Sequence, residues 1–145
     1  MVEVTLINGP NLAALGRREP DVYGHETLEG IVSRISREAS EMGARITSVQ
    51  AEGEGQVVCL VNAAAERGGA LIINPGAFSH SSVAIMDAMS AFPGPVIEVH
   101  ISNVHGREQF RRRLITATAA DAVISGAGTL GYSLALVLAV NLLRR

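Results

Sequence analysis

The 145-residue sequence lacks the features of several protein classes. It has no tryptophan, and its one cysteine, Cys59, excludes an intrachain disulfide and any cysteine-based metal motif. The longest apolar run, residues 134–143, is interrupted by Asn141 and is far shorter than the roughly 20 residues that cross a bilayer. Met1 leads into a short alternating run without the basic and apolar regions of an export signal. We therefore expect a cytoplasmic protein in a reducing compartment.

An excess of charge of one sign is also absent. The chain carries 12 basic and 14 acidic side chains, so no global positive field attracts a phosphate backbone, and nucleic acid is not an expected partner. Hydrophobic residues make up 48% of the chain but aromatic residues only 3%. Such a composition is typical of helices packed on both faces of a buried parallel sheet. The length fits a single domain, residues 1–145.

Strand-like and helical segments alternate along the chain. Strands are predicted at residues 4–7, 45–50, 70–73, 96–100 and 122–125. Helices are predicted at residues 28–42 and 55–67, from Ser81 or Ser82 to just before Phe92, and at residues 129–143. Right-handed crossovers then give an α/β fold, a flavodoxin-like doubly wound five-stranded parallel sheet in the order 2-1-3-4-5 with helices on both faces.

Polar segments follow three of the predicted strands. They span residues 8–24, 74–80 and 100–103. In an open α/β sheet, ligands bind outside the carboxyl ends of the strands, at the switch in strand order. We therefore expect these segments to converge on one pocket.

The segment from Gly16 to Gly24 sets Arg17 and Arg18 close to Tyr23, one of only two tyrosines. A guanidinium group stays charged, and a fixed positive charge nearby favours phenolate over phenol. Tyr23 is therefore a candidate general base. The structural alternative is a solvated basic turn whose tyrosine only packs by its ring.

His100 ends the alternating run of residues 96–100, in which Glu98 and His100 point to the same side of a strand. A carboxylate beside an imidazole fixes its tautomer and suits a proton donor. His80 and Asn74 lie in the loop before the third helix, a region suited to an anionic or hydroxylated ligand. Alternatively, His80 or Ser81 merely caps that helix, and Asn74 forms an Asx turn.

Two further patterns carry competing interpretations. If residues 107–113 are helical, Arg107 and Arg111 share one face that can hold a carboxylate or hydroxyls, whereas the neighbouring arginines are solvated. Residues 126–131 match the dinucleotide-binding pattern G-x-G-x-x-G, but only 14 residues follow Gly131, so no second strand and no ribose-binding acidic residue can follow. We interpret these glycines as a tight turn before the last helix.

Taken together, several motifs with preserved spacing resemble the type II 3-dehydroquinate dehydratases over essentially the full chain. The matching segments are residues 7–12 (INGPNL), 16–24 (GRREPDVYG), 74–77 (NPGA), 82–87 (SVAIMD) and 96–103 (VIEVHISN), with Arg107-Glu108, Phe110-Arg111 and Gly131-Tyr132 near the end. The resemblance implies a lyase that performs a trans-dehydration of 3-dehydroquinate to 3-dehydroshikimate without cofactor or metal. Either the shikimate pathway or quinate breakdown fits this reaction.

The resemblance also implies residue roles. Tyr23 removes a proton from C2, and Arg18 holds it as phenolate. Asn11 helps to stabilise an enolate-like intermediate through a bound water. His100 protonates the departing C1 hydroxyl, and Glu98 orients it. The implied substrate-binding residues are Asn74, His80, Asp87, Ile101, Ser102 and Arg111, with the substrate carboxylate on the backbone amides of Ile101 and Ser102.

By the same resemblance, Asp87 reaches the active site of a neighbouring subunit in a dodecamer of four trimers. The chain departs from the family at residues 51–53, where Ala51-Glu52-Gly53 stands for Ser-Asn-x, at Met86, which stands for arginine, and at Leu114 and Ala117, which stand for serines. From Met86 and residues 51–53 we expect weaker contacts between subunits or a weaker placement of Asp87. A non-catalytic small-molecule-binding or assembly homologue of the same fold is the alternative, and a nucleotide-binding module is a weaker one.

Overall fold

The computed structural model describes residues 1–145 and contains one five-stranded parallel sheet in the order β2-β1-β3-β4-β5. The predicted strand order is therefore confirmed. The strands are β1 (Val2–Asn8), β2 (Ala44–Gln50), β3 (Ala70–Asn74), β4 (Val96–His100) and β5 (Ala122–Ser125).

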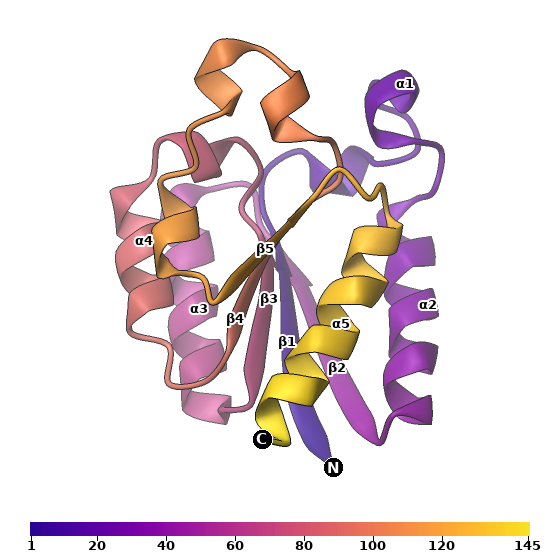
Figure 1. Cartoon of the computed structure of the whole chain (residues 1–145), viewed down its shortest axis with the longest axis vertical. Coiled ribbons are helices and arrows are strands. Elements are labelled where there is room, and N and C mark those ends of the chain that lie inside the picture. Colours follow the sequence, from indigo (N-terminus) through magenta and orange to yellow (C-terminus); the bar gives the residue numbers. More distant parts are fainter.

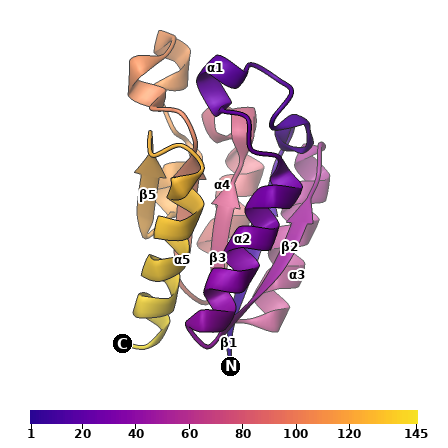
Figure 2. The same ribbon diagram turned by 90° about the vertical axis from the view of Figure 1, so that its right-hand side faces the viewer.

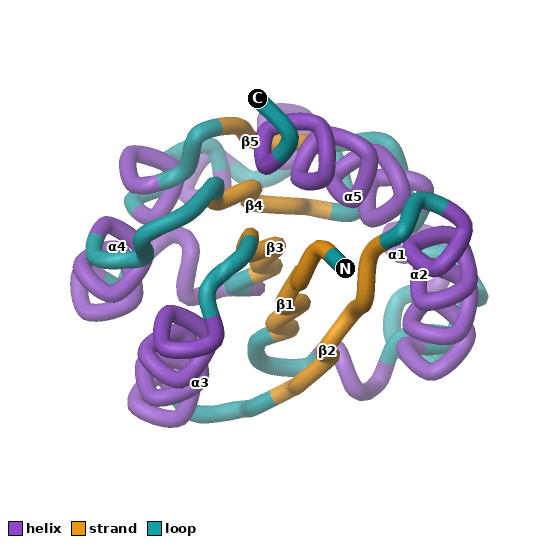
Figure 3. Tube along the Cα trace, turned by 90° about the horizontal axis from the view of Figure 1, so that it is seen from below, coloured by secondary structure: helices purple, strands orange, loops and turns teal.

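Helices cover both faces of the sheet (Figures 1 and 3). The short α1 (Pro20–Tyr23) lies above the sheet in the loop that leaves β1. Helices α2 (Leu28–Glu41) and α5 (Leu130–Leu143) lie side by side on one face, as Figure 2 shows. Helices α3 (Glu54–Arg67) and α4 (Val83–Ser90) cover the other face.

Alternating strand residues build two separate cores. Leu6 packs with the α2 and α5 side, whereas its neighbour Ile7 packs with the α3 and α4 side. Because successive side chains of a strand point to opposite faces, a strand buried on both sides must be apolar throughout. This explains why residues 70–73 of β3 are all apolar, whereas β1 and β4 also carry buried polar residues, Thr5 and Glu98.

The helix ends agree closely with the predicted boundaries. Thr27 caps α2 by accepting a 3.1 Å hydrogen bond from the Gly30 N–H, and Gly43, at a φ of +74°, ends the helix. None of the helices is long and apolar enough to span a membrane. Both chain ends lie at the end of the sheet opposite α1 and the loop that follows β4 (Figure 1).

The conditional helix over residues 107–113 is not formed. The segment instead contains one short 3-10 turn, Gln109–Arg111, and follows another, Val104–Gly106. Its one large apolar side chain, Phe110, is 65% exposed. Without an apolar face to pack on the sheet, a helix of two turns is not stable.

Candidate active site

The loops that follow β1, β3 and β4 converge on a pocket open to solvent at the carboxyl end of the sheet. It brings together nine of the eleven predicted site residues: Asn11, Arg18, Tyr23, Asn74, His80, His100, Ile101, Ser102 and Arg111. Glu98 is fully buried and contacts His100. Asp87 is exposed on α4 and does not line the pocket.

Two arginines lie against the ring of Tyr23, but only one of them is its neighbour in sequence. The guanidinium carbons of Arg18 and Arg107 lie 5.4 and 5.3 Å from the ring centroid. Arg107 Nη1 also donates a 2.6 Å hydrogen bond to the Tyr23 hydroxyl. The predicted proximity of Arg17 is wrong, because its exposed side chain folds back toward the carbonyl of Ala13.

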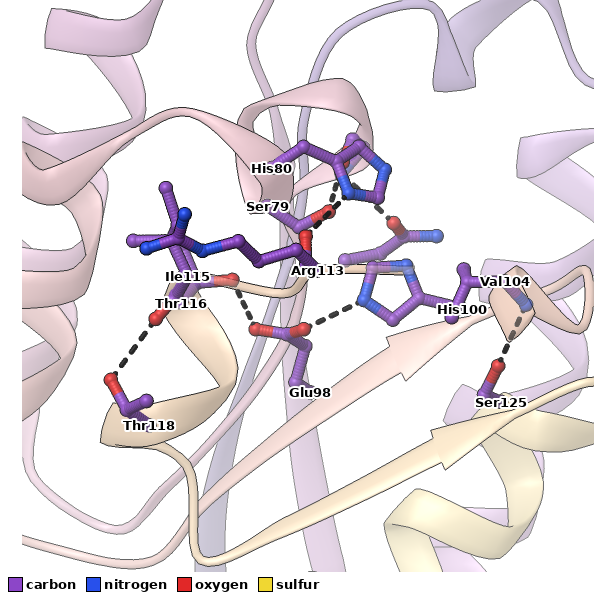
Figure 4. A network of polar contacts seen from close by, with 12 residues as sticks. Ser79, His80, Glu98, His100, Val104, Arg113, Ile115, Thr116, Thr118 and Ser125 are labelled. Atoms are coloured by element: carbon purple, nitrogen blue, oxygen red, sulfur yellow. Dashed lines mark hydrogen bonds and ion pairs between the residues drawn. The ribbon is translucent and has the colours of Figure 1, made fainter. Parts of the chain in front are cut away.

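His100 is held from behind by a buried carboxylate (Figure 4). Its Nε2 lies 2.7 Å from Glu98 Oε2, and the hydroxyl of Thr116 donates to the other oxygen, Oε1. Both carboxylate oxygens therefore have a partner, as a buried charge requires. Nδ1 is the imidazole nitrogen left without a protein partner. The sequence gives no signal for the role of Thr116.

His80 and Asn74 are both fixed by backbone groups. His80 Nδ1 contacts the carbonyl of Arg113, drawn as a dashed line in Figure 4, at 3.0 Å. Neither His80 nor Ser81 caps α4: Ser82 does, because its hydroxyl accepts a 2.9 Å hydrogen bond from the Ile85 N–H. Asn74 does form the Asx turn, accepting a 3.0 Å hydrogen bond from the Gly76 N–H, and it still lines the pocket.

The turn after β4 leaves two backbone donors free. The N–H groups of Ile101 and Ser102 have no partner among the chain's own carbonyls, whereas their carbonyls accept from the Gly128 N–H at 3.0 Å and the Ser125 hydroxyl at 3.1 Å. The predicted glycine turn is confirmed, since Gly126 and Gly128 have φ values of +88° and +62°. Two adjacent free N–H groups suit an anionic oxygen.

Asn11 adopts left-handed backbone, with a φ of +69°. Its N–H donates a 2.8 Å hydrogen bond to Glu52 Oε2, and Gln50 Nε2 donates to Glu52 Oε1 at 2.8 Å and to the carbonyl of Gly9 at 3.0 Å. The Asn11 N–H, followed by the Gln50 amide, lowers the pKa of the Glu52 carboxyl. Glu52, one of the departures from the family pattern, thus contacts the loop that carries a site residue.

The other departures pack within the subunit. Met86 is half-buried, and its sulfur accepts a 3.2 Å hydrogen bond from the Thr118 hydroxyl. Leu114 and Ala117 are half-buried in the same region. No three His, Cys, Asp or Glu side chains gather in an arrangement that holds a metal ion.

Comparisons with known proteins point to one family. The family model Dehydroquinase class II matches residues 2–140. The chain is 48% identical to the 3-dehydroquinate dehydratase of Mycobacterium leprae over 136 residues, 94% of each protein. It is 44% identical to that of Corynebacterium glutamicum over 140 residues, 97% of each. The crystal structure of type II dehydroquinase from Propionibacterium acnes matches with a TM-score of 0.94 and 36% identity over 97% of each chain.

Proposed function

This chain belongs to the class II dehydroquinase family, and we propose that it dehydrates 3-dehydroquinate to 3-dehydroshikimate with Tyr23 as base and His100 as acid. One observation carries the assignment of roles. The Tyr23 hydroxyl, hydrogen-bonded to an arginine, lines the same pocket as the His100 imidazole, which is hydrogen-bonded to a buried carboxylate. A base and an acid are therefore available to one bound substrate.

Tyr23 acts first. Its phenolate removes the C2 proton, and the electron pair delocalises into the C3 carbonyl as an enolate. The 2.6 Å contact from Arg107 and the charge of Arg18 stabilise the phenolate before the proton is transferred. Asn11, nearer the start of the same loop between β1 and α2, stabilises the enolate oxygen through a bound water.

His100 completes the reaction. The enolate re-forms the carbonyl, the C1–C2 double bond appears, and the C1 hydroxyl leaves as water with a proton from Nδ1 of the imidazolium. Glu98, bonded to Nε2, holds the ring in place and stabilises its positive charge. The Thr116 hydroxyl keeps that carboxylate in position.

The remaining pocket groups bind the substrate. The free N–H groups of Ile101 and Ser102 donate to the substrate carboxylate, and Arg111 adds positive charge on the pocket wall. Asn74 and His80 bind hydroxyl groups. The substrate is thus held by fixed donors, which sets the reacting carbons between Tyr23 and His100.

The resemblance to the family implies an assembly in which subunits share sites, and we propose it for this chain. In this proposal Asp87 serves the pocket of a neighbouring subunit in a trimer; its exposure on α4, outside the pocket of its own chain, supports that role. Four trimers form a dodecamer, which works in the cytoplasm.

A direct assay tests this function. Purified protein is mixed with 3-dehydroquinate, and the absorbance of the conjugated enone of the product is followed. Tyr23→Phe removes the base with little change in volume and is expected to lower the rate by roughly 10²–10⁴-fold. EDTA treatment is expected to leave the rate unchanged. Absence of product with the folded wild-type protein, or more than about a tenth of the rate in Tyr23→Phe, contradicts the proposal.

A further inference from the structure

Three polar side chains meet behind the pocket, in the interior of the fold. Asn8 ends β1, Asn74 ends β3 beside it, and Tyr132 lies in the first turn of α5. All three are buried. The hydroxyl of Tyr132 lies 2.6 Å from Asn8 Oδ1 and 2.9 Å from Asn74 Nδ2. Of the three, only Asn74 lines the pocket.

The Gly76 N–H can only donate, and this determines the direction of each hydrogen bond in the group. This donor lies 3.0 Å from one end of the Asn74 amide, so that end must be the oxygen, since two N–H groups cannot bond to one another. The NH₂ end of Asn74 then faces Tyr132, whose hydroxyl oxygen accepts. The one hydrogen of Tyr132 is left for Asn8 Oδ1.

Asn8 has one amide end that makes no hydrogen bond, which is energetically unfavourable. Its Nδ2 is buried and has no hydrogen-bond partner. A buried unpaired N–H is unfavourable, and such groups are rare in folded proteins. The acceptor that Asn8 offers to Tyr132 is the compensating contact. Burial raises the pKa of Tyr132, which keeps its hydrogen in place for this bond.

We propose that Tyr132 is a positioning residue, which locks the Asn74 amide so that its second N–H donates to an oxygen of the bound substrate. The Asn74 oxygen is engaged by Gly76, and one of its two amide hydrogens is engaged by Tyr132, so the remaining hydrogen is the one without a protein partner. Asn74 therefore recognises an acceptor, such as a hydroxyl or carbonyl oxygen. This inference rests on the proposed function, which supplies the substrate.

A double-mutant cycle tests the proposal on the full chain. KM and kcat for 3-dehydroquinate are measured for wild type, Tyr132→Phe, Asn74→Ala and the double variant, after circular dichroism has verified that each is folded. Tyr132→Phe is expected to raise KM about tenfold, the worth of one hydrogen bond near 1.4 kcal/mol, with a smaller effect on kcat. In the Asn74→Ala background, the same change is expected to leave KM within about twofold.

A control separates positioning from general loss of stability. Asp121 accepts a 2.8 Å hydrogen bond from the Val96 N–H at the opposite end of the sheet. Asp121→Ala removes this bond and is expected to lower the melting temperature without changing KM. An equal rise in KM for Asp121→Ala, or independent effects of Tyr132→Phe and Asn74→Ala in the cycle, overturns the proposal.

A second variant covers the case in which Tyr132→Phe does not fold. Asn8→Ala keeps the Tyr132 hydroxyl but removes the acceptor of its hydrogen, and KM is expected to rise at least threefold. An unchanged KM in folded Asn8→Ala rejects the proposed network. If wild type itself forms no 3-dehydroshikimate, the proposed function has failed. If wild type is active but KM is unchanged in these variants, only the positioning role is rejected.

Discussion

At the scale of single residues, the two arginines at Tyr23 are not equivalent. The side chain of Arg107 is 15% exposed and donates directly to the hydroxyl, whereas that of Arg18 is 42% exposed and faces the ring. Solvent screens the charge of an exposed side chain. A hydrogen bond from a charged donor is also stronger than a contact that involves no hydrogen bond. In the proposed mechanism, Arg107 therefore supplies the larger part of the stabilisation of the phenolate.

Arg107→Met tests this assignment because it keeps an apolar stem and removes the charge. The rate at neutral pH is expected to fall about a hundredfold, because the proposed base loses its charge-assisted hydrogen bond, and the loss is expected to be smaller at alkaline pH. Arg18→Ala is expected to show the same pattern more weakly. The control is Arg17→Ala, whose exposed side chain lies away from Tyr23. A pH–rate profile of Arg107→Met parallel to that of wild type argues against the assignment.

His100→Ala separates the two proton transfers. Loss of the C1 hydroxyl is expected to stop, while Tyr23 still exchanges the C2 proton. The measurement is deuterium uptake at C2 in heavy water, compared with the rate of product formation. Equal large losses in both rates mean that one residue does not act without the other.

Thr116→Val tests the support of Glu98. The change keeps the shape of the side chain but leaves a buried carboxylate oxygen unpaired, which is expected to cost about 1–3 kcal/mol of unfolding free energy and to lower kcat. Urea unfolding of wild type and variant gives the difference. Thr118→Val is the matched control, because its exposed hydroxyl contacts only the Ile115 carbonyl and Met86. Equal losses in both variants contradict a special role for Thr116.

At the scale of elements, the strands and long helices were predictable because their apolar periodicity reflects burial on the two faces of the sheet. The conformation of residues 101–119 was not predictable, because polar contacts between residues far apart in sequence stabilise it. The Ile115 N–H donates to the Ser79 carbonyl at 2.7 Å, and His80 contacts the Arg113 carbonyl. The same reason explains why Arg107, and not Arg17, reaches Tyr23.

The site residues that could be predicted are those at the ends of strands. The pocket contains the predicted His100 and Asn74 because carboxyl ends of parallel strands share one edge. The supporting contacts from Thr116 and Tyr132 were not predictable, since neither residue lies next to its partner in sequence.

The loop between β1 and α2 depends on a carboxylate of the loop between β2 and α3. Because the fold lowers the pKa of Glu52, its contribution to stability is complete above the unfolded value of about 4.3 and is lost as the pH falls through the lower, folded value. Urea unfolding from pH 7 to pH 3 is expected to show wild type losing its advantage over Glu52→Gln with acidification. A constant difference between the two proteins contradicts the linkage.

Glu52→Gln is also expected to reduce the rate at neutral pH severalfold, because the Asn11 backbone is held less firmly. Glu54→Gln provides the control, since this exposed glutamate makes no side-chain hydrogen bond to the loop. Equal rates for wild type and Glu52→Gln mean that the contact with Asn11 does not matter for turnover.

At the scale of the whole molecule, a single chain exposes two features that contacts between subunits would cover. Leu130, Leu134 and Val137 form an exposed apolar stripe on α5. Asp87 is exposed and outside the pocket of its own chain. Both are consistent with packing between subunits.

Mixed assemblies test the shared site. Tyr23→Phe and Asp87→Ala are each expected to be inactive alone, whereas assemblies formed by refolding the two together are expected to recover about a quarter of the activity, in sites that combine an intact residue from each parent. Sedimentation over a dilution series reports the oligomer. A fully active monomer, or no recovery in verified mixed oligomers, refutes the shared site.

The position of the chain ends has a practical consequence. Met1 and Arg145 lie at the end of the sheet away from the site loops (Figure 1). The seven residues of β1, at about 3.3 Å each, separate that end from the pocket by roughly 20 Å. A solid support or a fused second enzyme attached at either terminus therefore leaves the entrance of the pocket open, so the protein can be immobilised in a defined orientation for continuous synthesis.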